Sequence, residues 1–273
     1  MSLQDQGTAA ITGASTGIGA VYADRLARRG FDLLLNARNR QRLDTLAAKL
    51  RAETGRKVTV LAADLATVAG QSAVETALRA DPNISMLVNN AGVGAVAPLL
   101  AADADKMTDM IALNVTALTR LTYAAAPAFA ARGNGTIVNV SSIVAVHPEL
   151  LNGVYGATKA FVLALTQSLH HELAAKGVRV QAVLPGAIAT EFWDIAGNPV
   201  RNIPAEIVMT AEDLVDSALA GLDAGELVTL PSLPEIADWV AFEIARRAMM
   251  PNLSRNRPAQ RYLSGRAVTR RAS

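Results

Sequence analysis

The chain has 273 residues, 51% of them apolar, and its formal net charge is only +2 at neutral pH. It contains no cysteine, so disulfides and thiolate metal sites are excluded. No apolar run reaches the roughly 20 residues that a membrane span needs, and the polar start MSLQDQ carries no apolar signal segment. The composition therefore predicts a cytoplasmic α/β protein of one large domain or two small ones, without membrane association.

Short apolar segments alternate with longer amphipathic ones along the chain. Most of the short segments are apolar on both faces, which predicts buried parallel strands. The expected strands are residues 8–12, 31–36, 57–63, 84–89, 136–140, 178–184 and 226–230. The expected helices are residues 17–29, 39–54, 67–80, 105–131, 152–175 and 211–224, with one more between 231 and 250. This alternation predicts one domain, residues 1–250, with a doubly wound (Rossmann) mostly parallel seven-stranded sheet and helices on both faces.

The basic residues gather at the C-terminal end. Residues 251–273 hold six arginines and no acid, whereas the other 250 residues carry 20 basic and 24 acidic side chains. The simplest interpretation of this arginine-rich tail is a solvated terminus, and the alternative is an arm that pairs with an acidic face of a neighbouring subunit. Nucleic-acid binding is not expected, because no basic patch with interleaved aromatic residues supports it.

A glycine-rich turn follows the first expected strand. Residues 12–19 read TGASTGIG, with Gly13 suited to a tight turn, Gly17 to close approach of a pyrophosphate, and Gly19 to packing of the next helix on the sheet. The helix N-terminus then offers backbone amides to the phosphates. A turn in this position predicts a dinucleotide site, and in such sheets ligands bind beyond the carboxyl ends of the strands.

Arginines follow the second expected strand. An acid there would bind the ribose hydroxyls of NAD, whereas an arginine accommodates a 2′-phosphate. The sequence offers Arg38, Arg40 and Arg42, and no acid precedes Asp44. We therefore expect NADP(H) in preference to NAD(H), with Arg38 on the phosphate and Arg42 at the start of an amphipathic helix. Asp64, after the third strand, is expected either to bind adenine or to cap the next helix.

Tyr155 and Lys159 stand one helical turn apart, with Ser142 upstream. Residues four apart share a helix face, so the lysine ammonium is expected to favour the tyrosinate and lower the tyrosine pKa from about 10 toward neutrality. The pair then suits general acid–base chemistry, and the Ser142 hydroxyl suits a substrate oxygen.

Taken together, these residues resemble the short-chain dehydrogenase/reductase family. The resemblance rests on TGASTGIG at 12–19, NNAG at 89–92, Asn114, Ser142, YGATK at 155–159 and PGAIAT at 185–190. It implies that Tyr155 donates a proton in reduction, that Ser142 holds the carbonyl or alcohol oxygen, and that Lys159 also binds the nicotinamide ribose. Asn114 would hold a water that links Lys159 to solvent, while Ser141 would be structural.

The resemblance also implies an NAD(P)-dependent oxidoreductase acting on C=O or CH–OH groups by direct hydride transfer, with reduction favoured. The cofactor-binding residues that it implies are Gly13, Ser15, Thr16, Gly17, Ile18, Gly19, Arg38, Asp64, Leu65, Asn90, Ala91, Gly92, Tyr155, Lys159, Pro185, Gly186, Ile188 and Thr190. A homodimer or homotetramer through the helices at 105–131 and 152–175 is expected; the C-terminus lacks the glycine-rich finish of many tetrameric members.

Two mainly apolar segments are expected to enclose the substrate. Residues 187–209 form a long connection of the kind that often closes over a site, and it carries Phe192 and Trp193. Residues 143–154 would form the opposite wall, with His147 a candidate polar contact. These segments predict a ketone or aldehyde with an apolar body, although Arg201 leaves an anionic acyl thioester open. None of the three histidines has metal-ligand spacing, so no metal is expected.

Two other classes of protein compete with the reductase. A catalytically idle NADP-binding regulator or scaffold on the same fold would be expected to lack one of the four catalytic residues, and all four are present. A dehydratase or epimerase would be expected to show an altered residue set or a longer substrate domain, and the chain has neither.

Overall fold

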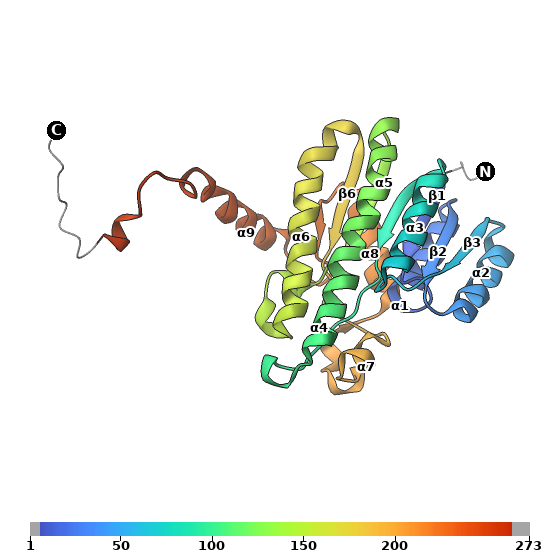
Figure 1. Ribbon diagram of the computed structural model, residues 1–273, viewed down its shortest axis with the longest axis horizontal. Helices are drawn as coiled ribbons and strands as arrows, with labels where there is room; N and C mark the ends of the chain where they lie inside the picture. Colours follow the sequence, from blue (N-terminus) through green and yellow to red (C-terminus); the bar gives the residue numbers. More distant parts are fainter. Residues whose placement is uncertain (1–5, 264–273) are drawn as a thin grey trace. The chain divides into compact units, whose positions relative to one another are not determined.

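Seven strands of the computed structural model, which describes residues 6–263, form one parallel sheet (Figure 1). They pair in the order β3-β2-β1-β4-β5-β6-β9. Their bounds are Thr8–Thr12 (β1), Asp32–Ala37 (β2), Val58–Ala62 (β3), Ile84–Asn89 (β4), Gly135–Val140 (β5), Val178–Val183 (β6) and Val228–Thr229 (β9). The predicted fold class is confirmed, because runs that are apolar on both sides lie buried between two helical layers.

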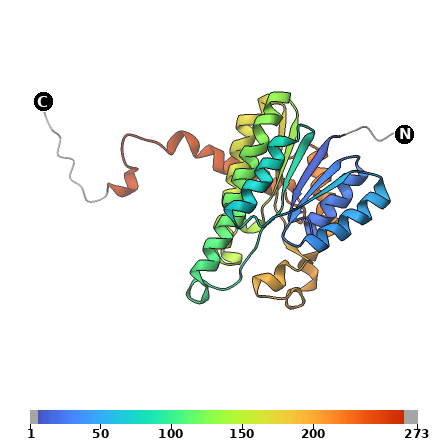
Figure 2. The ribbon, with the colours of Figure 1, turned by 45° about the vertical axis from the view of Figure 1, so that its right-hand side comes forward.

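Three helices cover each face of the sheet (Figure 2). One core contains side chains of α1 (Gly17–Arg28), α2 (Arg40–Thr54) and α8 (Ala211–Asp223). The other core contains side chains of α3 (Val68–Ala80), α5 (Leu118–Arg132) and α6 (Gly153–Leu173). Neighbouring residues of β1 enter opposite cores, Ala9 and Ile11 one and Ala10 the other, as the twofold periodicity of a strand requires.

The helix expected at 105–131 is interrupted. It consists of α4 (Ala104–Ile111), a π-helical turn (Ala112–Ala117) and α5. The turn contains Asn114, whose amide group hydrogen-bonds in both directions with the backbone of Val93. Asn114 is therefore held by contacts outside its own helix. Turns of this kind inside α-helices often occur at functional sites.

The connection at 187–209 is not a structureless loop. Its ends form a small parallel pair of strands, β7 (Ala187–Ile188) and β8 (Val208–Met209), and it contains the short helix α7 (Phe192–Ala196). Because β7 pairs with β8, the two ends of the connection are fixed to each other. The segment between them is therefore a loop anchored at both ends rather than a free lid. Sequence patterns missed these pieces because each is only two to five residues long.

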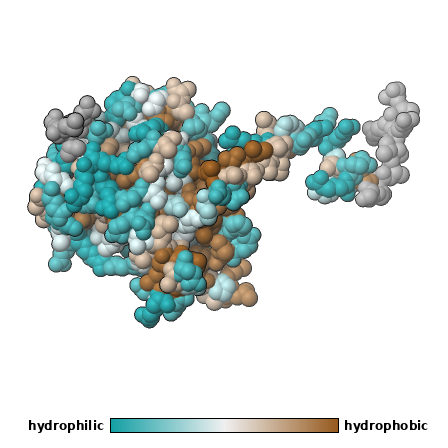
Figure 3. All heavy atoms as spheres, turned by 180° about the vertical axis from the view of Figure 1, so that it is seen from behind, coloured by the Kyte–Doolittle hydropathy of each residue, from teal (hydrophilic) through white to brown (hydrophobic). Residues whose placement is uncertain are grey.

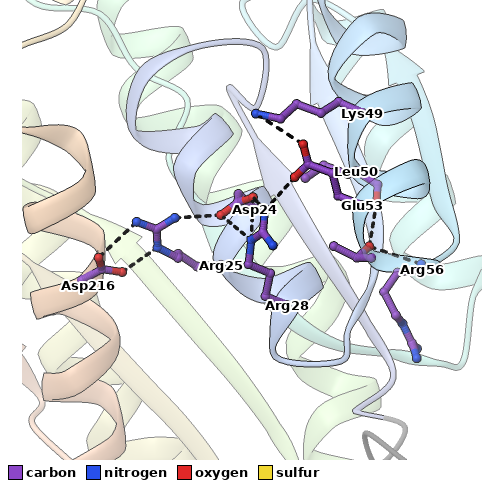
Figure 4. Close-up of polar contacts among 9 residues, drawn as sticks. Asp24, Arg25, Arg28, Lys49, Leu50, Glu53, Arg56 and Asp216 are labelled. Carbon is purple, nitrogen blue, oxygen red and sulfur yellow. Dashed lines mark hydrogen bonds and ion pairs between the residues drawn. The ribbon is translucent and has the colours of Figure 1, made fainter.

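Ion pairs join the outer helices α1, α2 and α8 (Figure 4). Arg25 of α1 contacts Asp216 of α8 at 2.7 Å, and Arg28 of α1 contacts Glu53 of α2 at 2.6 Å. Asp24 contacts both arginines. Hydrophilic residues are widespread on the face drawn in Figure 3. Exposed pairs of this kind contribute about 0–1 kcal/mol each, so the buried cores carry most of the stability.

The chain divides into two compact units, Met1–Ser232 and Leu233–Ser273. The second unit begins before the boundary that the sequence places after residue 250, and it contains α9 (Ile236–Ala248). No residue of α9 is buried, and the rings of Trp239 and Phe242 stack at 5.2 Å. None of the helices in residues 6–263 combines the length and the apolar character that a membrane span requires. Residues 264–273, with three arginines of the predicted tail, lie outside the described part of the chain.

Candidate active site

A cavity of about 800 Å³ lies at the carboxyl ends of the sheet strands. The predicted site residues that line it are Gly13, Ser15, Thr16, Gly17, Ile18, Arg38, Asp64, Leu65, Asn90, Ala91, Gly92, Ser142, Tyr155, Lys159, Pro185, Gly186, Ile188, Thr190, Phe192 and Trp193. Three predicted residues do not line it. Gly19 and Asn114 are buried behind the wall, and His147 is exposed elsewhere.

The glycine turn forms the floor of one end of the cavity. Gly13 and Gly17 have φ values of +64° and +53°, a region that strongly favours glycine. A Cβ at Gly17 would lie 3.0 Å from Cγ2 of Thr190, and a Cβ at Gly19 would overlap the carbonyl oxygen of Gly13. No acidic residue occupies the first turn of α1, so its N-terminus presents amides to an anion.

Thr12 and Asn90 fix this turn at the point where the strand order reverses. The Thr12 hydroxyl accepts hydrogen bonds from the backbone amides of Asn90 and Ala91, both at 3.0 Å. The Asn90 side chain donates in return to the carbonyl oxygens of Thr12 at 2.9 Å and Gly13 at 3.2 Å. These reciprocal bonds hold the ends of β1 and β4 together, so Asn90 supports the glycine turn.

The arginines after β2 have different surroundings. Arg38 is exposed and lines the cavity, and among residues 6–263 it makes no ion pair. Arg40 contacts Asp44 at 2.8 Å and does not line the cavity. Arg42 does line it, and contacts Glu191 at 2.7 Å. Sequence reasoning treated Arg42 only as a helix start and missed Glu191, since 149 residues separate the partners.

Asp64 lines the cavity beyond β3. Its carboxylate accepts a hydrogen bond from the backbone amide of Ala66 at 3.0 Å. The N-cap of α3 is Thr67, whose side chain accepts from Gly70. Of the two roles open for Asp64, helix capping is therefore filled by Thr67, while the carboxylate stays at the cavity wall.

The first turns of α6 position Tyr155 and Lys159. Asn152 caps the helix by accepting from the amides of Val154 at 2.9 Å and Tyr155 at 3.2 Å, and its amide donates to Ala97 at 2.6 Å. Tyr155 and Lys159 are only 5% and 6% exposed. The Lys159 ammonium donates to the carbonyl oxygen of Val140 at 2.9 Å, so it is anchored to β5. The spacing did not reveal Asn152, although Asn before a helix is an N-cap signal.

Burial decides the pKa values of this pair. It raises the pKa of Tyr155 to about 12, against a smaller lowering effect of a hydrogen bond with Ser142. It lowers the pKa of Lys159 to about 8. The expectation that Lys159 brings the Tyr155 pKa toward neutrality is wrong for this structure, because removal from water favours the neutral form of each group. Tyr155 is thus a protonated phenol at neutral pH, which suits a proton donor.

Asn114 lies behind the cavity wall, close to Lys159. Its amide donates to the Val93 carbonyl at 2.8 Å and to the Thr158 hydroxyl at 3.1 Å, and its oxygen accepts from the Val93 amide at 3.0 Å. A Cβ at Gly92 would lie 3.1 Å from the Asn114 oxygen and 3.5 Å from the Lys159 nitrogen. Asn114 therefore fixes the 92–93 backbone beside Lys159.

The hydroxyls of the two serines after β5 make hydrogen bonds of different lengths. The Ser141 hydroxyl donates to the Lys159 carbonyl at 2.7 Å, which is a structural bond within the core. The Ser142 hydroxyl donates to the Pro185 carbonyl at 3.4 Å and accepts from the Val144 amide at 3.3 Å. Both of these bonds are long, so the Ser142 hydroxyl, which also hydrogen-bonds with Tyr155, can turn to a substrate oxygen at little cost.

The other end of the cavity is apolar. The Phe192 ring lies 5.8 Å from the Tyr155 ring and 5.5 Å from the Trp193 ring, and the Trp193 indole donates to the Ile188 carbonyl at 3.0 Å. Further apolar lining comes from Leu150, Leu151, Ile195, Ile203, Pro204 and Ile207. Neither His147 nor Arg201 lines the cavity. This end is therefore mainly apolar, with Asn198 and Asn202 as polar residues in its lining.

Comparison with known proteins connects the site to a family. The model of the short chain dehydrogenase family matches residues 7–198. A short-chain dehydrogenase from Sphingobium yanoikuyae, solved in complex with NADPH, is 49% identical, with a TM-score of 0.91 over 94% of this chain and 99% of that one. The bulky-bulky ketone specific alcohol dehydrogenase from Comamonas testosteroni is 45% identical, with a TM-score of 0.86 over 94% and 98%.

A curated relative extends the comparison to another substrate class. Very-long-chain 3-oxoacyl-CoA reductase-A of Danio rerio is 34% identical over 209 residues, which are 73% of this chain and 65% of that protein. The chain thus spans just under two thirds of that reductase.

Proposed function

Because this chain belongs to the short-chain dehydrogenase family, we propose that it is an NADPH-dependent reductase of ketones or aldehydes with apolar bodies. One observation carries the proposal. Tyr155, Lys159 and Ser142 line a single cavity that has a glycine turn and Arg38 at one end and apolar side chains at the other.

The residues present fit NADPH. Gly13 and Gly17 leave space for a pyrophosphate at the N-terminus of α1, and Arg38 is available for a 2′-phosphate. Asp64 would face the adenine, and Lys159 the nicotinamide ribose. When bound, the nicotinamide supplies the reducing equivalent, while the protein supplies position and electrostatics. NAD(H) lacks the 2′-phosphate and is expected to bind more weakly.

The protein's own groups perform the proton chemistry. The Ser142 hydroxyl donates to the substrate carbonyl oxygen and holds it beside Tyr155. The phenol, kept neutral by burial, donates its proton to that oxygen as the alcohol forms. Lys159 remains largely charged at neutral pH and stabilises the tyrosinate that results. Asn114 holds the backbone beside Lys159, where a water linked to solvent would return the proton.

The substrate is a ketone with bulky apolar substituents. Apolar lining beyond Tyr155 supports this class, and so does the name of the Comamonas testosteroni relative. A 3-oxoacyl thioester is the second candidate, favoured by the name of the Danio rerio relative. Coenzyme A carries phosphates, yet the cavity-lining cations are Arg38, Arg42 and Lys159, all on the nucleotide side or at the catalytic centre. The ketone is therefore preferred.

We also propose a homodimer or homotetramer in the cytoplasm. Support for the assembly comes from Tyr123 on α5 and Phe161 on α6, which are 66% and 39% exposed despite their apolar rings. Elution volume with light scattering tests the assembly, and it does not bear on the reaction.

Binding of NADPH and NADH to the purified protein tests the cofactor assignment. We expect NADPH to bind at least about tenfold more tightly, because an arginine–phosphate contact is a strong charge-assisted interaction. Turnover with a diaryl ketone and with a 3-oxoacyl-CoA then separates the two substrate classes. Equal affinity for both cofactors would refute the 2′-phosphate assignment, and binding of neither would favour a regulator without catalysis.

A further inference from the structure

The Arg42–Glu191 ion pair joins two distant parts of the cavity wall. Arg42 lies in the first turn of α2, and Glu191 follows β7 and directly precedes α7. Their side chains approach to 2.7 Å and are 49% and 56% exposed, so both meet solvent as well as the cavity. Glu191 is also next to Thr190, which packs against Gly17 of the glycine turn. The carboxylate therefore lies on the nucleotide side of the cavity.

Charges on this side are few. Among the described residues that line the cavity, the acids are Asp64 and Glu191, and the arginines are Arg38 and Arg42. The Asp64 carboxylate is already turned to the Ala66 amide. Arg42 is thus the arginine of this wall that a carboxylate neutralises, and Glu191 is the acid that does so.

We propose that Glu191 competes with the cofactor 2′-phosphate for Arg42, and so sets the strength of NADPH selection. The inference rests on the proposed function, because it concerns the same nucleotide end. A phosphate carries nearly twice the charge of a carboxylate and offers three oxygens to a guanidinium, so it displaces Glu191 from Arg42. Glu191 then lowers NADPH affinity by occupying Arg42.

Displacement of Glu191 from Arg42 by the phosphate also affects the substrate end, because Glu191 is adjacent in sequence to residues of that end. Glu191 is followed at once by Phe192 and Trp193, whose rings form the apolar wall beside Tyr155. Release of Glu191 from Arg42 frees the start of α7 from α2. Recognition of the 2′-phosphate is thereby coupled to the segment that contacts the substrate.

The first test measures dissociation constants of NADPH and NADH for Glu191→Gln. Loss of a surface carboxylate that opposes the phosphate should tighten NADPH about fivefold and leave NADH unchanged. In an Arg42→Gln background the same substitution should give no tightening, because the shared partner is gone. Arg40→Gln is the matched control: Arg40 is on the same helix, contacts Asp44 and does not line the cavity.

Three results would overturn the inference. They are an equal change for NADPH and NADH, no change for either, and tightening that persists without Arg42. Failure of the proposed function looks different, because wild-type protein would then show no preference for NADPH. Urea unfolding of each variant checks that the fold is unchanged.

The second test follows the coupling by fluorescence. The chain has two tryptophans, Trp193 in α7 and Trp239 in α9, so Trp239→Phe leaves Trp193 as the reporter. Adenosine 2′,5′-bisphosphate should change Trp193 emission, whereas 5′-AMP should not. The response should disappear in Arg42→Gln. An equal response to both nucleotides, or no response to bound bisphosphate, would contradict the coupling.

Discussion

The two ends of the cavity are built by different physical means. At the proposed catalytic end, Asn114, Tyr155 and Lys159 are at most 6% exposed. Backbone carbonyls accept from the Asn114 and Lys159 side chains, and the Asn152 side chain accepts from the Tyr155 amide. At the nucleotide end, Arg38 and Arg42 are exposed, and the Arg42–Glu191 ion pair is a surface contact. Burial makes the first end rigid and shifts its pKa values, whereas water screens the charges of the second.

The difference predicts how each end responds to mutation. Removal of a buried group with a fixed geometry should have a large effect, because its hydrogen-bond partners are left unsatisfied. An exposed charge changes affinity gradually and depends on ionic strength. Substitutions at the catalytic end should therefore reduce turnover, while those at the nucleotide end should shift cofactor preference.

Tyr155→Phe should give the largest effect and tests the catalytic end directly. Removal of the proton donor should lower kcat by roughly 10²- to 10⁴-fold, the contribution typical of general acid catalysis. NADPH affinity should change little, because the ring and its packing against Phe192 remain. Tyr123→Phe, on an exposed part of α5, is the control that should leave kcat unchanged. Wild-type turnover in Tyr155→Phe would refute the catalytic assignment.

Local sequence signals were sufficient for the sheet and for most of the cavity wall. Most of the strands are apolar on both sides, and the glycine turn follows β1 directly, so neither required knowledge of distant contacts. In contrast, the π-turn at Asn114 depends on its bonds to Val93, 21 residues away. The Arg42–Glu191 pair forms only because the fold brings Glu191 back beside Arg42, although 149 residues separate them in sequence.

The expectation that the Tyr155 pKa is lowered was wrong for a different reason. Helical spacing correctly placed Lys159 near the tyrosine, with its ammonium 5.9 Å from the ring centroid. It gave no measure of how deeply α6 and β5 bury both groups. Since desolvation favours neutral forms, burial reversed the expected direction.

Arg38→Asp should give an intermediate effect and tests the nucleotide end. Replacing an attractive charge by a repulsive one should weaken NADPH by roughly 10- to 100-fold, with little change for NADH. Isothermal titration at low and high salt measures both, and the NADPH penalty should shrink at high salt. Equal losses for the two cofactors would mean that Arg38 supports the fold of this edge rather than the 2′-phosphate.

The pH dependence of the reductive rate should give the smallest effect near neutrality, about a twofold loss between pH 7 and pH 8, and it tests the charge of Lys159 without a substitution. The pKa of Lys159 is about 8, so its ammonium is lost as pH rises through that value. The rate should then fall by about tenfold for each further pH unit, as expected for one essential proton. Lys159→Met should lower the rate at neutral pH and remove this alkaline limb.

Stability should move in the opposite direction over the same range. An unfolded lysine has a pKa near 10.4, so between about 8 and 10.4 the unfolded state binds more protons than the folded state, and the free energy of unfolding rises with pH. Tyr155, with a folded pKa of about 12, acts only above about pH 10, where it reverses the trend. Urea unfolding of wild type and Lys159→Met across pH 7–10 measures the Lys159 contribution. A rate that falls in parallel with stability would mean that unfolding, and not the charge of Lys159, limits activity at high pH.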